Sequence, residues 1–412
     1  MALAQANALG VSRQLAARAR VSSRPTSRPK LKSPDQSVSD AGSMPVRSPY
    51  RLDVELGLLY YTVDEAWAPL SARVPRPEGF IVVEEVDGRP CTEFRGGEEG
   101  DRAVYLMIKK GVDHLTASLE VSRALGRRLH FLGVKDANAI TYQLAYVMGP
   151  PPRAEVRGRG FELRLLGMHR GRLRHTGNRF EVLLEGADEG ELGRRASRLS
   201  SLGRVLNYFG YQRFGARRPN SHLVGKAIAK GDLRGAVDLI IGRPYPGEPE
   251  VARAFRSLYD SGDPEGALRA IPRRGYELER RVLSEYLRTG DPARALRASP
   301  LPPSFFVEAY QSYLFNLCLS RALEGGEVLP RLRVPARAPE AEGVCKEVMR
   351  DEGVEGLSGP LARARPMVRA SWAEVRGPEV RGGGWVTFSL PRGSYATVVL
   401  RELLRQDPLT FT

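Results

Sequence analysis

Residues 130–143 read HFLGVKDANAITYQ. The first five of them, His130 to Val134, form a short and mostly apolar run with a glycine near its end, which favours a buried strand. Such a strand would deliver the charged pair Lys135 and Asp136 to its end, at the edge of a cleft. On the residues alone, Asp136 could be a nucleophile, a general base or the N-cap of a helix that begins at Ala137.

A second informative stretch, residues 206–215, reads LNYFGYQRFG. It interleaves aromatic rings with amides and an arginine. Aromatic faces stack on bases, amides read base edges and arginine holds phosphate, so the mixture suits a nucleotide extruded from an RNA. The alternative is a core strand whose two glycines permit tight turns.

The charge of the chain agrees with a nucleic-acid partner. Lys and Arg number 63 against 48 acidic residues, which gives a formal net charge of +15. An excess of this size attracts polyanions over long distances. The stretch 153–218 holds fifteen arginines and seven acidic residues and is the most cationic part of the chain expected to fold.

Cysteine and histidine spacing predicts neither a disulfide framework nor a metal site. The three cysteines are odd in number, far apart and without CxxC spacing, so we expect them to be reduced and structural. The five histidines include no HExxH pair. No apolar run approaches the roughly 20 residues that span a bilayer, so a soluble protein is expected. We also expect it to be cytoplasmic and monomeric.

Strand-like segments flank a helix-rich middle, which predicts an α+β domain interrupted by an insertion. Residues 1–45 are rich in Ser, Pro and Arg and are expected to be a disordered basic extension: a tail, a transit peptide or a product of an early start codon before Met44. The expected strands are 80–84, 103–108, 161–166, 180–184 and 384–390, and the expected helices are 113–127, 251–259, 278–287 and 396–405.

Together the two motifs resemble the TruD family of pseudouridine synthases, whose pattern includes G-x-K-D-x-x-A-x-T-x-Q and N-Y-F-G-x-Q-R-F-G. Further similarity to this family appears at residues 77–82, 177–180, 311–316 and 390–397, so the resemblance covers about 75 to 410. The segment HLVGK at 222–226 looks more like the archaeal members than the bacterial ones.

The resemblance implies a pseudouridine synthase fold, a mixed and mainly antiparallel sheet flanked by helices, with an inserted α/β TRUD domain. Residues 50–225 and 376–412 would form the catalytic domain, and 226–375 the insertion. The implied reaction breaks the N1 glycosidic bond of a uridine, U13 of tRNA, and rejoins the base through C5. It needs no metal or other cofactor.

The family's active-site positions carry over to Asp136 as nucleophile and to Asn207 and Phe209 as substrate-binding residues. A basic partner would keep the aspartate ionised. Family members have that residue six positions before Phe80, where this chain has a valine. Arg73, Arg76 or Lys135 could replace it, and Arg76 and Lys135 are the candidates for substrate binding.

Other charged residues are interpreted as structural. We expect Lys109 and Lys110 to lie on a solvated face or on an RNA-facing rim, and Arg401 to pair with Glu402. A glycoside hydrolase would require a second carboxylate, and nothing in the sequence links Glu84 or its neighbour to Asp136. The remaining alternatives are a base-flipping glycosylase, a catalytically inactive RNA-binding protein and a pseudouridine synthase that acts on a different RNA.

Overall fold

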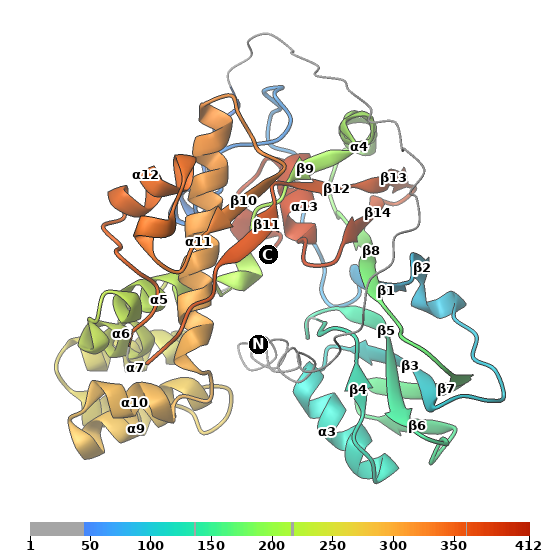
Figure 1. Cartoon of the computed structure of the whole chain (residues 1–412), viewed down its shortest axis with the longest axis horizontal. Helices are drawn as coiled ribbons and strands as arrows, with labels where there is room; N and C mark the ends of the chain where they lie inside the picture. The colour runs from blue at the N-terminus through green and yellow to red at the C-terminus, as the bar shows by residue number, and fades with distance from the viewer. Residues whose placement is uncertain (1–44, 136, 216–217, 360) are drawn as a thin grey trace, which may run out of the picture.

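The computed structural model describes residues 45–135, 137–215, 218–359 and 361–412 (Figure 1). Asp136 and all but the last residue of the predicted N-terminal extension lie outside the described residues. A helix-rich part and a sheet part lie side by side in Figure 1 and meet at the top of the view. The C-terminus lies between the two parts in this view.

A ten-stranded sheet forms the sheet part, in the order β13-β14-β8-β1-β5-β3-β7-β6, with β2 beside β1 and β4 beside β5. The pair β1 and β5 is parallel, and the other described pairs of this sheet are antiparallel, as the predicted mixed and mainly antiparallel sheet requires. Its strands are β1 (Phe80–Val86), β2 (Arg89–Pro90), β3 (Arg102–Lys110), β4 (His130–Phe131), β5 (Ile140–Met148), β6 (Glu155–Gly158), β7 (Phe161–His169), β8 (His175–Leu183), β13 (Arg376–Arg381) and β14 (Trp385–Pro391).

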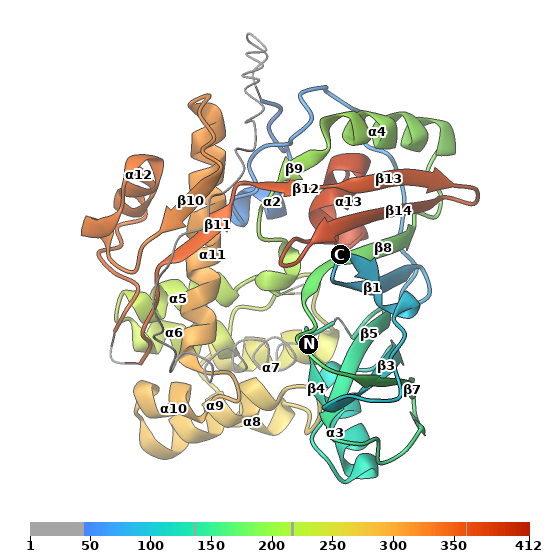
Figure 2. The ribbon, with the colours of Figure 1, turned by 45° about the vertical axis from the view of Figure 1, so that its right-hand side comes forward.

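Figure 2 shows β13, β14, β8, β1 and β5 running on as one twisted surface. A tight turn joins β1 to β2: Asp87 and Gly88 both have positive φ, at 50° and 82°. Two consecutive residues with positive φ suit the turn that joins antiparallel strands.

Helix α3 (His114–Leu125) covers one face of the sheet. Asp113 caps it by accepting from the Thr116 amide, and Gly126 ends it in the left-handed conformation at φ 64°. Ala117, Val121 and Leu125 recur at helical spacing and are buried in a core cluster shared with β3, β5 and β7. The helix predicted over 113–127 is thus confirmed, with Asp113 and Gly126 as its caps.

The helix-rich part consists mostly of short helices, two of which begin at Gly-Asp-Pro steps of the sequence. Asp263 and Asp291 each accept hydrogen bonds from main-chain amides of the next helix, and a proline occupies the first turn of that helix in both cases. The helices are α5 (Ser221–Ala229), α6 (Leu233–Ile241), α7 (Glu250–Asp260), α8 (Pro264–Ala270), α9 (Glu277–Thr289), α10 (Pro292–Ala298), α11 (Pro303–Glu324) and α12 (Gly343–Asp351).

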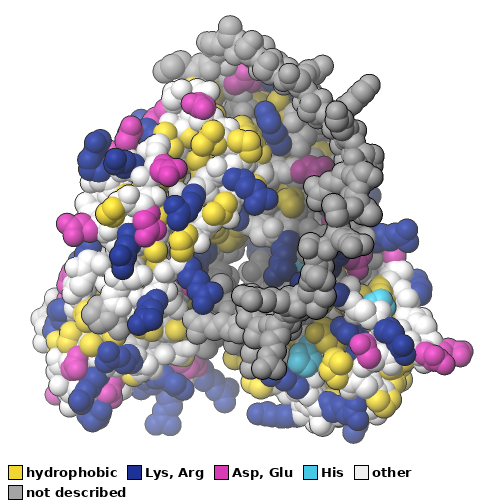
Figure 3. Space-filling model, viewed as in Figure 1, with side chains coloured by type: hydrophobic (Ala, Val, Ile, Leu, Met, Phe, Trp, Pro, Cys, Tyr) yellow, Lys and Arg dark blue, Asp and Glu magenta, His cyan; other side chains and the backbone are white. Residues whose placement is uncertain are grey.

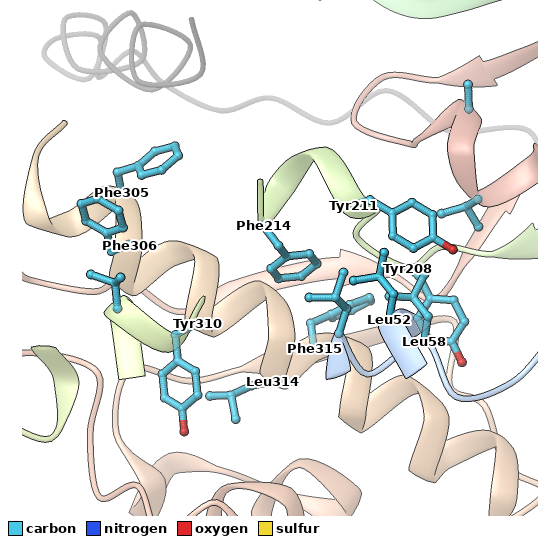
Figure 4. Close-up of a cluster of buried hydrophobic side chains, with 14 of the residues drawn as sticks. Leu52, Leu58, Tyr208, Tyr211, Phe214, Phe305, Phe306, Tyr310, Leu314 and Phe315 are labelled. Atoms are coloured by element: carbon cyan, nitrogen blue, oxygen red, sulfur yellow. The ribbon is translucent and has the colours of Figure 1, made fainter. Parts of the chain in front are cut away.

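Helix α11 connects the two parts. Its aromatic and aliphatic side chains are buried, and Figure 4 shows Phe214 and Phe315 in the same cluster as Leu52 and Tyr211. Asn316, in the middle of α11, donates from its side chain to the carbonyls of Leu56 (2.9 Å) and Phe209 (3.1 Å). One hydrophobic cluster therefore runs through both predicted domains.

The remaining elements lie where the two parts meet. Strand β9 (Arg204–Leu206) pairs antiparallel with β12 (Trp372–Glu374), and β10 (Arg331–Val334) pairs with β11 (Met367–Ala370). Helix α4 (Glu189–Leu202) packs on β13, and α2 (Arg51–Glu55) and α13 (Ala396–Leu404) are joined through their side chains. The predicted insertion thus returns to the catalytic domain along β12, beside the motif 206–215.

Of four further sequence expectations, three are wrong and one is confirmed. The strand expected over 130–134 is only the two-residue β4, because just His130 and Phe131 find partners in β5. The expected pair of Arg401 and Glu402 is present at 3.9 Å, and Asp53 of α2 lies closer to Arg401, at 2.6 Å. Lys109 is buried because its strand lies inside the sheet.

The fourth concerns the cysteines. Cys318 of α11 and Cys345 of α12 form a disulfide, and Cys91 is free and buried. The two bonded cysteines are 27 residues apart in sequence, and only the packing of α12 on α11 brings their Cα atoms to 5.1 Å. Spacing alone could not reveal such a pair.

Candidate active site

Asn207 lies directly after β9 and is held from several sides. Its amide N–H donates to the Ser371 carbonyl (2.8 Å), and its side-chain Nδ2 donates to the Ala370 carbonyl (2.9 Å). Its side-chain Oδ1 accepts from Ser394 Oγ (3.1 Å). The first two partners belong to the predicted insertion, and the third belongs to the loop before α13. Residues from both predicted domains therefore hold Asn207.

Arg369 of β11 is the remaining partner of Asn207, and sequence reasoning missed it. Its Nε donates to the Asn207 carbonyl (2.9 Å) and its Nη2 to Asn207 Oδ1 (2.7 Å). Its guanidinium also lies over the ring of Phe209, 4.1 Å from the centroid. Burial lowers the pKa of Arg369 to about 10. No local motif distinguishes this arginine among the many of the chain.

Phe209 is surrounded by aromatic rings. Its ring meets Phe315 of α11 edge to face, with centroids 5.6 Å apart, and Tyr395 in the same manner at 6.1 Å. Its main-chain N–H donates to Asn316 Oδ1 (2.8 Å). The ring remains partly exposed, so it combines a fixed position with an accessible surface. This is the property that base stacking requires.

Lys135 makes a buried ion pair with Glu84 of β1. The Nζ to Oε1 distance is 2.7 Å, and the exposed fractions of the two side chains are 5% and 0%. The second carboxylate oxygen of Glu84 accepts from the Leu144 amide (3.0 Å). Lys135 is therefore directed into the protein, and Glu84, which the sequence left without a role, is its partner.

His175 of β8 adjoins this pair. Its Nδ1 lies 3.9 Å from Glu84 Oε1, and its Nε2 contacts Asn178 Oδ1 at 3.2 Å. Burial, and next the charge of Lys135, lower the pKa of His175. The lowered pKa favours the neutral imidazole, which leaves Glu84 and Lys135 to balance each other's charge.

Lys109 approaches the same segment from β3. Its Nζ donates to the Lys135 carbonyl (3.3 Å) and the Val112 carbonyl (3.4 Å), and the residue is 1% exposed. Lys110, the next residue, is exposed and pairs with Glu78 (3.0 Å). The two lysines expected to share a solvated surface therefore differ: Lys109 supports the segment that carries the Lys-Asp motif, and Lys110 lies at the surface.

Arg76 lies on the other side of the motif. Its Nη1 donates to the Asn138 carbonyl (3.1 Å), and its guanidinium lies 3.9 Å from the centroid of the Phe80 ring. Arg73, the second arginine considered, forms an exposed pair with Glu185 (2.6 Å). Of the three basic candidates, Arg76 is the one whose side chain contacts the residues that follow Asp136.

The two groups of residues are connected across the sheet. Leu390 of β14 is in register with Asn178 of β8, which is in register with Glu84 of β1. The loop that follows β14 carries Ser394 and Tyr395, which contact Asn207 and Phe209. Lys135 thus contacts β1, and Asn207 contacts the loop after β14, with β8 between these two strands of the sheet.

In the space-filling view a hollow lies between the helix-rich part and the sheet part, and Lys and Arg side chains are spread over both (Figure 3). Among the described residues, no cluster of three or more His, Cys, Asp or Glu could hold a metal ion. Within the same residues, no helix is long and apolar enough to cross a membrane.

Comparisons with known proteins agree on one family. A model of the family described as tRNA pseudouridine synthase D (TruD) matches residues 55–335. A protein named tRNA pseudouridine synthase D from Sulfurisphaera tokodaii is 36% identical over 364 residues, 87% of this chain and 100% of the relative. One of the same name from Saccharolobus solfataricus is 36% identical over 378 residues, 89% of this chain and 100% of the relative.

A solved structure described as tRNA pseudouridine synthase D (TruD), from Methanosarcina mazei, superimposes with a TM-score of 0.66 at 25% identity and covers 87% of this chain and 98% of that one. The mixed sheet and the two motifs, with these similarities, define the chain as an enzyme of the pseudouridine synthase class. It belongs to the TruD family of tRNA pseudouridine synthases.

Proposed function

We propose that this enzyme isomerises one uridine of tRNA, U13, to pseudouridine, and that Asp136 is its nucleophile. The observation that carries the proposal is the anchoring of the chain on both sides of residue 136. Lys135 is held by Glu84 in a buried ion pair, and the Asn138 carbonyl accepts from Arg76. Fixing the flanks of a reactive carboxylate lowers the entropy that must be lost when it meets the sugar.

The reaction conserves the atoms of the substrate. The bond between N1 of the base and C1′ of the ribose breaks, the base turns, and a bond forms between C5 and C1′, while the proton leaves C5 and a proton is gained at N1. A carboxylate at position 136 can either attack a carbon covalently or remove a proton from the sugar. Both routes give the same product.

The proposed roles of the other residues follow from their contacts. Phe209 stacks on the extruded uracil, since its ring is fixed by Phe315 and Tyr395 and remains accessible. Asn207 positions the base or the Asp136 carboxylate. Arg76 supplies the positive charge beside the aspartate, and Lys135 anchors the segment through Glu84 rather than contacting the RNA.

Three other functions predict different results with tRNA. A catalytically inactive RNA-binding protein would bind tRNA and convert nothing, and a synthase for another RNA would leave tRNA unchanged while it modifies a different transcript. A glycosylase would release free uracil.

The experiment incubates the enzyme and its Asp136→Asn variant with an unmodified tRNA transcript and with one in which U13 is replaced by cytidine. We expect wild type to convert U13 without a change in RNA mass, and Asp136→Asn to bind the transcript but convert no uridine. Asp188→Asn is the matched control, because Asp188 caps α4 and asparagine caps equally well. Conversion of another uridine refutes the U13 assignment, and an active Asp136→Asn refutes the nucleophile.

A further inference from the structure

Arg369 is a cation surrounded by neutral groups. Its described hydrogen-bond acceptors are two carbonyl oxygens, both from Asn207, and its nearest rings are Phe209 and Phe315, at 4.1 and 5.7 Å. Among the described residues, no carboxylate lies within ion-pair distance of its guanidinium. Arg369 is half-buried, so these carbonyl oxygens and ring faces replace part of the water around its charge and fix the direction of its guanidinium.

The guanidinium determines how the amide of Asn207 is oriented. An arginine only donates hydrogen bonds, so the atom of the Asn207 side chain that faces Arg369 must be the oxygen. Ser394 donates to the same oxygen, which fills both of its lone pairs. Of the two N–H groups on Nδ2, one donates to the Ala370 carbonyl, and the other has no described acceptor.

The same guanidinium limits how Phe209 can be used. It covers one face of the ring at 4.1 Å, and Phe315 and Tyr395 meet the ring in T-shaped contacts. A base that stacks on Phe209 is therefore restricted to the opposite face. Because Asn207 and Phe209 are two residues apart and bound to one side chain, their relative placement is set by Arg369.

We propose that Arg369, which reaches the site from the predicted insertion, is a positioning residue: it makes Asn207 present an N–H donor, and leaves one face of Phe209, to the reacting nucleotide. The chemical partner of Asn207 is then an acceptor, either a carboxylate oxygen or a carbonyl oxygen of the uracil. This inference rests on the proposed function, because it assigns Asn207 and Phe209 to the reaction site.

The test compares Arg369→Lys with wild type in single-turnover conversion of the unmodified tRNA transcript, together with the Kd for that transcript. Lysine retains the charge but cannot bond the carbonyl and Oδ1 of Asn207 with one planar fork. We expect the rate at saturating enzyme to fall about 10²-fold, as for a misplacement near 1 Å, while the Kd changes less than about threefold.

The decisive measurement repeats the substitution in an Asn207→Ala background. If Arg369 acts through Asn207, the additional loss there is small, less than about fivefold, because coupled residues are not additive. Equal losses in the two backgrounds overturn the proposal, as does a wild-type rate for Arg369→Lys. A change confined to the Kd overturns it too, since it would make Arg369 an RNA contact.

Arg195→Lys is the matched control. Arg195 is a buried arginine that donates to the main-chain carbonyls of Leu403 (2.8 Å) and Ala68 (2.7 Å) and lies over the Trp67 ring at 5.1 Å. It also pairs with Glu191 (2.6 Å), so it supports α4 and α13 and has no contact with Asn207 among the described residues. An equal rate loss in this control would mean that Arg369→Lys slows the reaction only by destabilising the fold, and would overturn the proposal.

Thermal unfolding shows whether the variants fold. If Arg369→Lys does not, Arg369→Met decides, because methionine has a similar length and cannot donate to the Asn207 carbonyl or Oδ1. A reduced rate that disappears in the Asn207→Ala background supports the proposal, and a wild-type rate overturns it. If wild type itself converts no uridine of tRNA, the proposed function fails and the role of Arg369 fails with it, whereas an active wild type with an unaffected variant refutes the role alone.

Discussion

The carboxylate of Glu84 lies 2.7 Å from the ammonium of Lys135, and both side chains are almost completely excluded from solvent. Each ion would be costly in this position alone, and the second oxygen of Glu84 is satisfied by the Leu144 amide. The pair therefore fastens the chain immediately before Asp136 to the parallel neighbours β1 and β5.

Replacing Glu84 by Gln should destabilise the enzyme strongly. The substitution leaves the buried Lys135 ammonium without a carboxylate, so the free energy of unfolding should fall by about 3–5 kcal/mol. Denaturant unfolding measures the change. Glu185→Gln, which breaks the exposed pair with Arg73, should cost no more than about 1 kcal/mol. Equal losses for the two variants would mean that the buried pair contributes no more to the free energy of unfolding than the exposed pair does.

Arg76 and Arg73 should differ in their effect on the reaction. Arg76→Ala removes the guanidinium that contacts Asn138 and lies on Phe80, so kcat should fall by at least about tenfold. Arg73→Ala removes an exposed charge paired with Glu185 and should leave kcat within about twofold of wild type. Steady-state kinetics on the tRNA transcript measures both, and a larger loss for Arg73→Ala would reverse the assignment.

Phe209 should tolerate an aromatic replacement and not an aliphatic one. Phe209→Leu loses the stacking surface, which is equivalent to about 1–3 kcal/mol per base, so kcat/KM should fall roughly tenfold or more. Phe209→Tyr keeps the ring and should retain most of the activity. If the leucine and tyrosine variants lose activity equally, the ring acts by packing on Phe315 and Tyr395 instead.

Acidification should destabilise the fold through two buried histidines. Burial lowers the pKa of His222 to about 3 and that of His114 to about 4. Below the unfolded pKa of about 6.5 the unfolded chain binds these protons and the folded chain does not, so stability falls as the pH decreases from 6.5 towards 4.

His222→Phe tests this pH dependence, because phenylalanine keeps the ring between Phe214 and Tyr313 and removes the titrating group. The hydrogen bond of His222 to the Glu55 main chain is also lost, so the comparison is of the pH slope and not of the absolute stability. Between pH 6 and pH 5 the variant should lose about 1.4 kcal/mol less stability than wild type. Unfolding curves at the two pH values give the difference. An unchanged slope would mean that His222 is protonated in the folded enzyme.

Reduction of the Cys318–Cys345 disulfide should weaken the packing of α12 on α11. The bond closes a loop with a sequence separation of 27, so its loss should lower the free energy of unfolding by about 3 kcal/mol. Thermal unfolding with and without a reductant measures this. Alkylation of the denatured, unreduced enzyme should label Cys91 alone, and labelling of three cysteines would contradict the bond.

Much of the fold was predictable because its signals are local. The caps Asp113 and Gly126, the Asp87-Gly88 turn and the Asp-Pro helix starts each act within a few residues. The motif 206–215 likewise predicted Asn207 and Phe209 as neighbours in a site, and the structure places both beside Tyr395 and Ser394.

The remaining features depend on contacts between distant segments. Arg369 is one arginine among many in the sequence. The pairing of β12, which follows β11 directly, with β9 brings Arg369 to Asn207, 162 residues earlier. The partner of Lys135 lies 51 residues away in a strand that reads as ordinary core sequence. Lys109 was expected at the surface, but β3 lies inside the sheet and its neighbours bury this side chain.

The pairing of β9 with β12 also has a consequence for synthesis on the ribosome. Asn207 is translated 163 residues before Ala370, which accepts its side-chain amide. At about 5–20 residues per second, this interval lasts roughly 8 to 30 seconds. The nascent chain therefore carries Asn207 without this partner for about two-fifths of translation, and Ala370 arrives when only 42 of the 412 residues remain to be added.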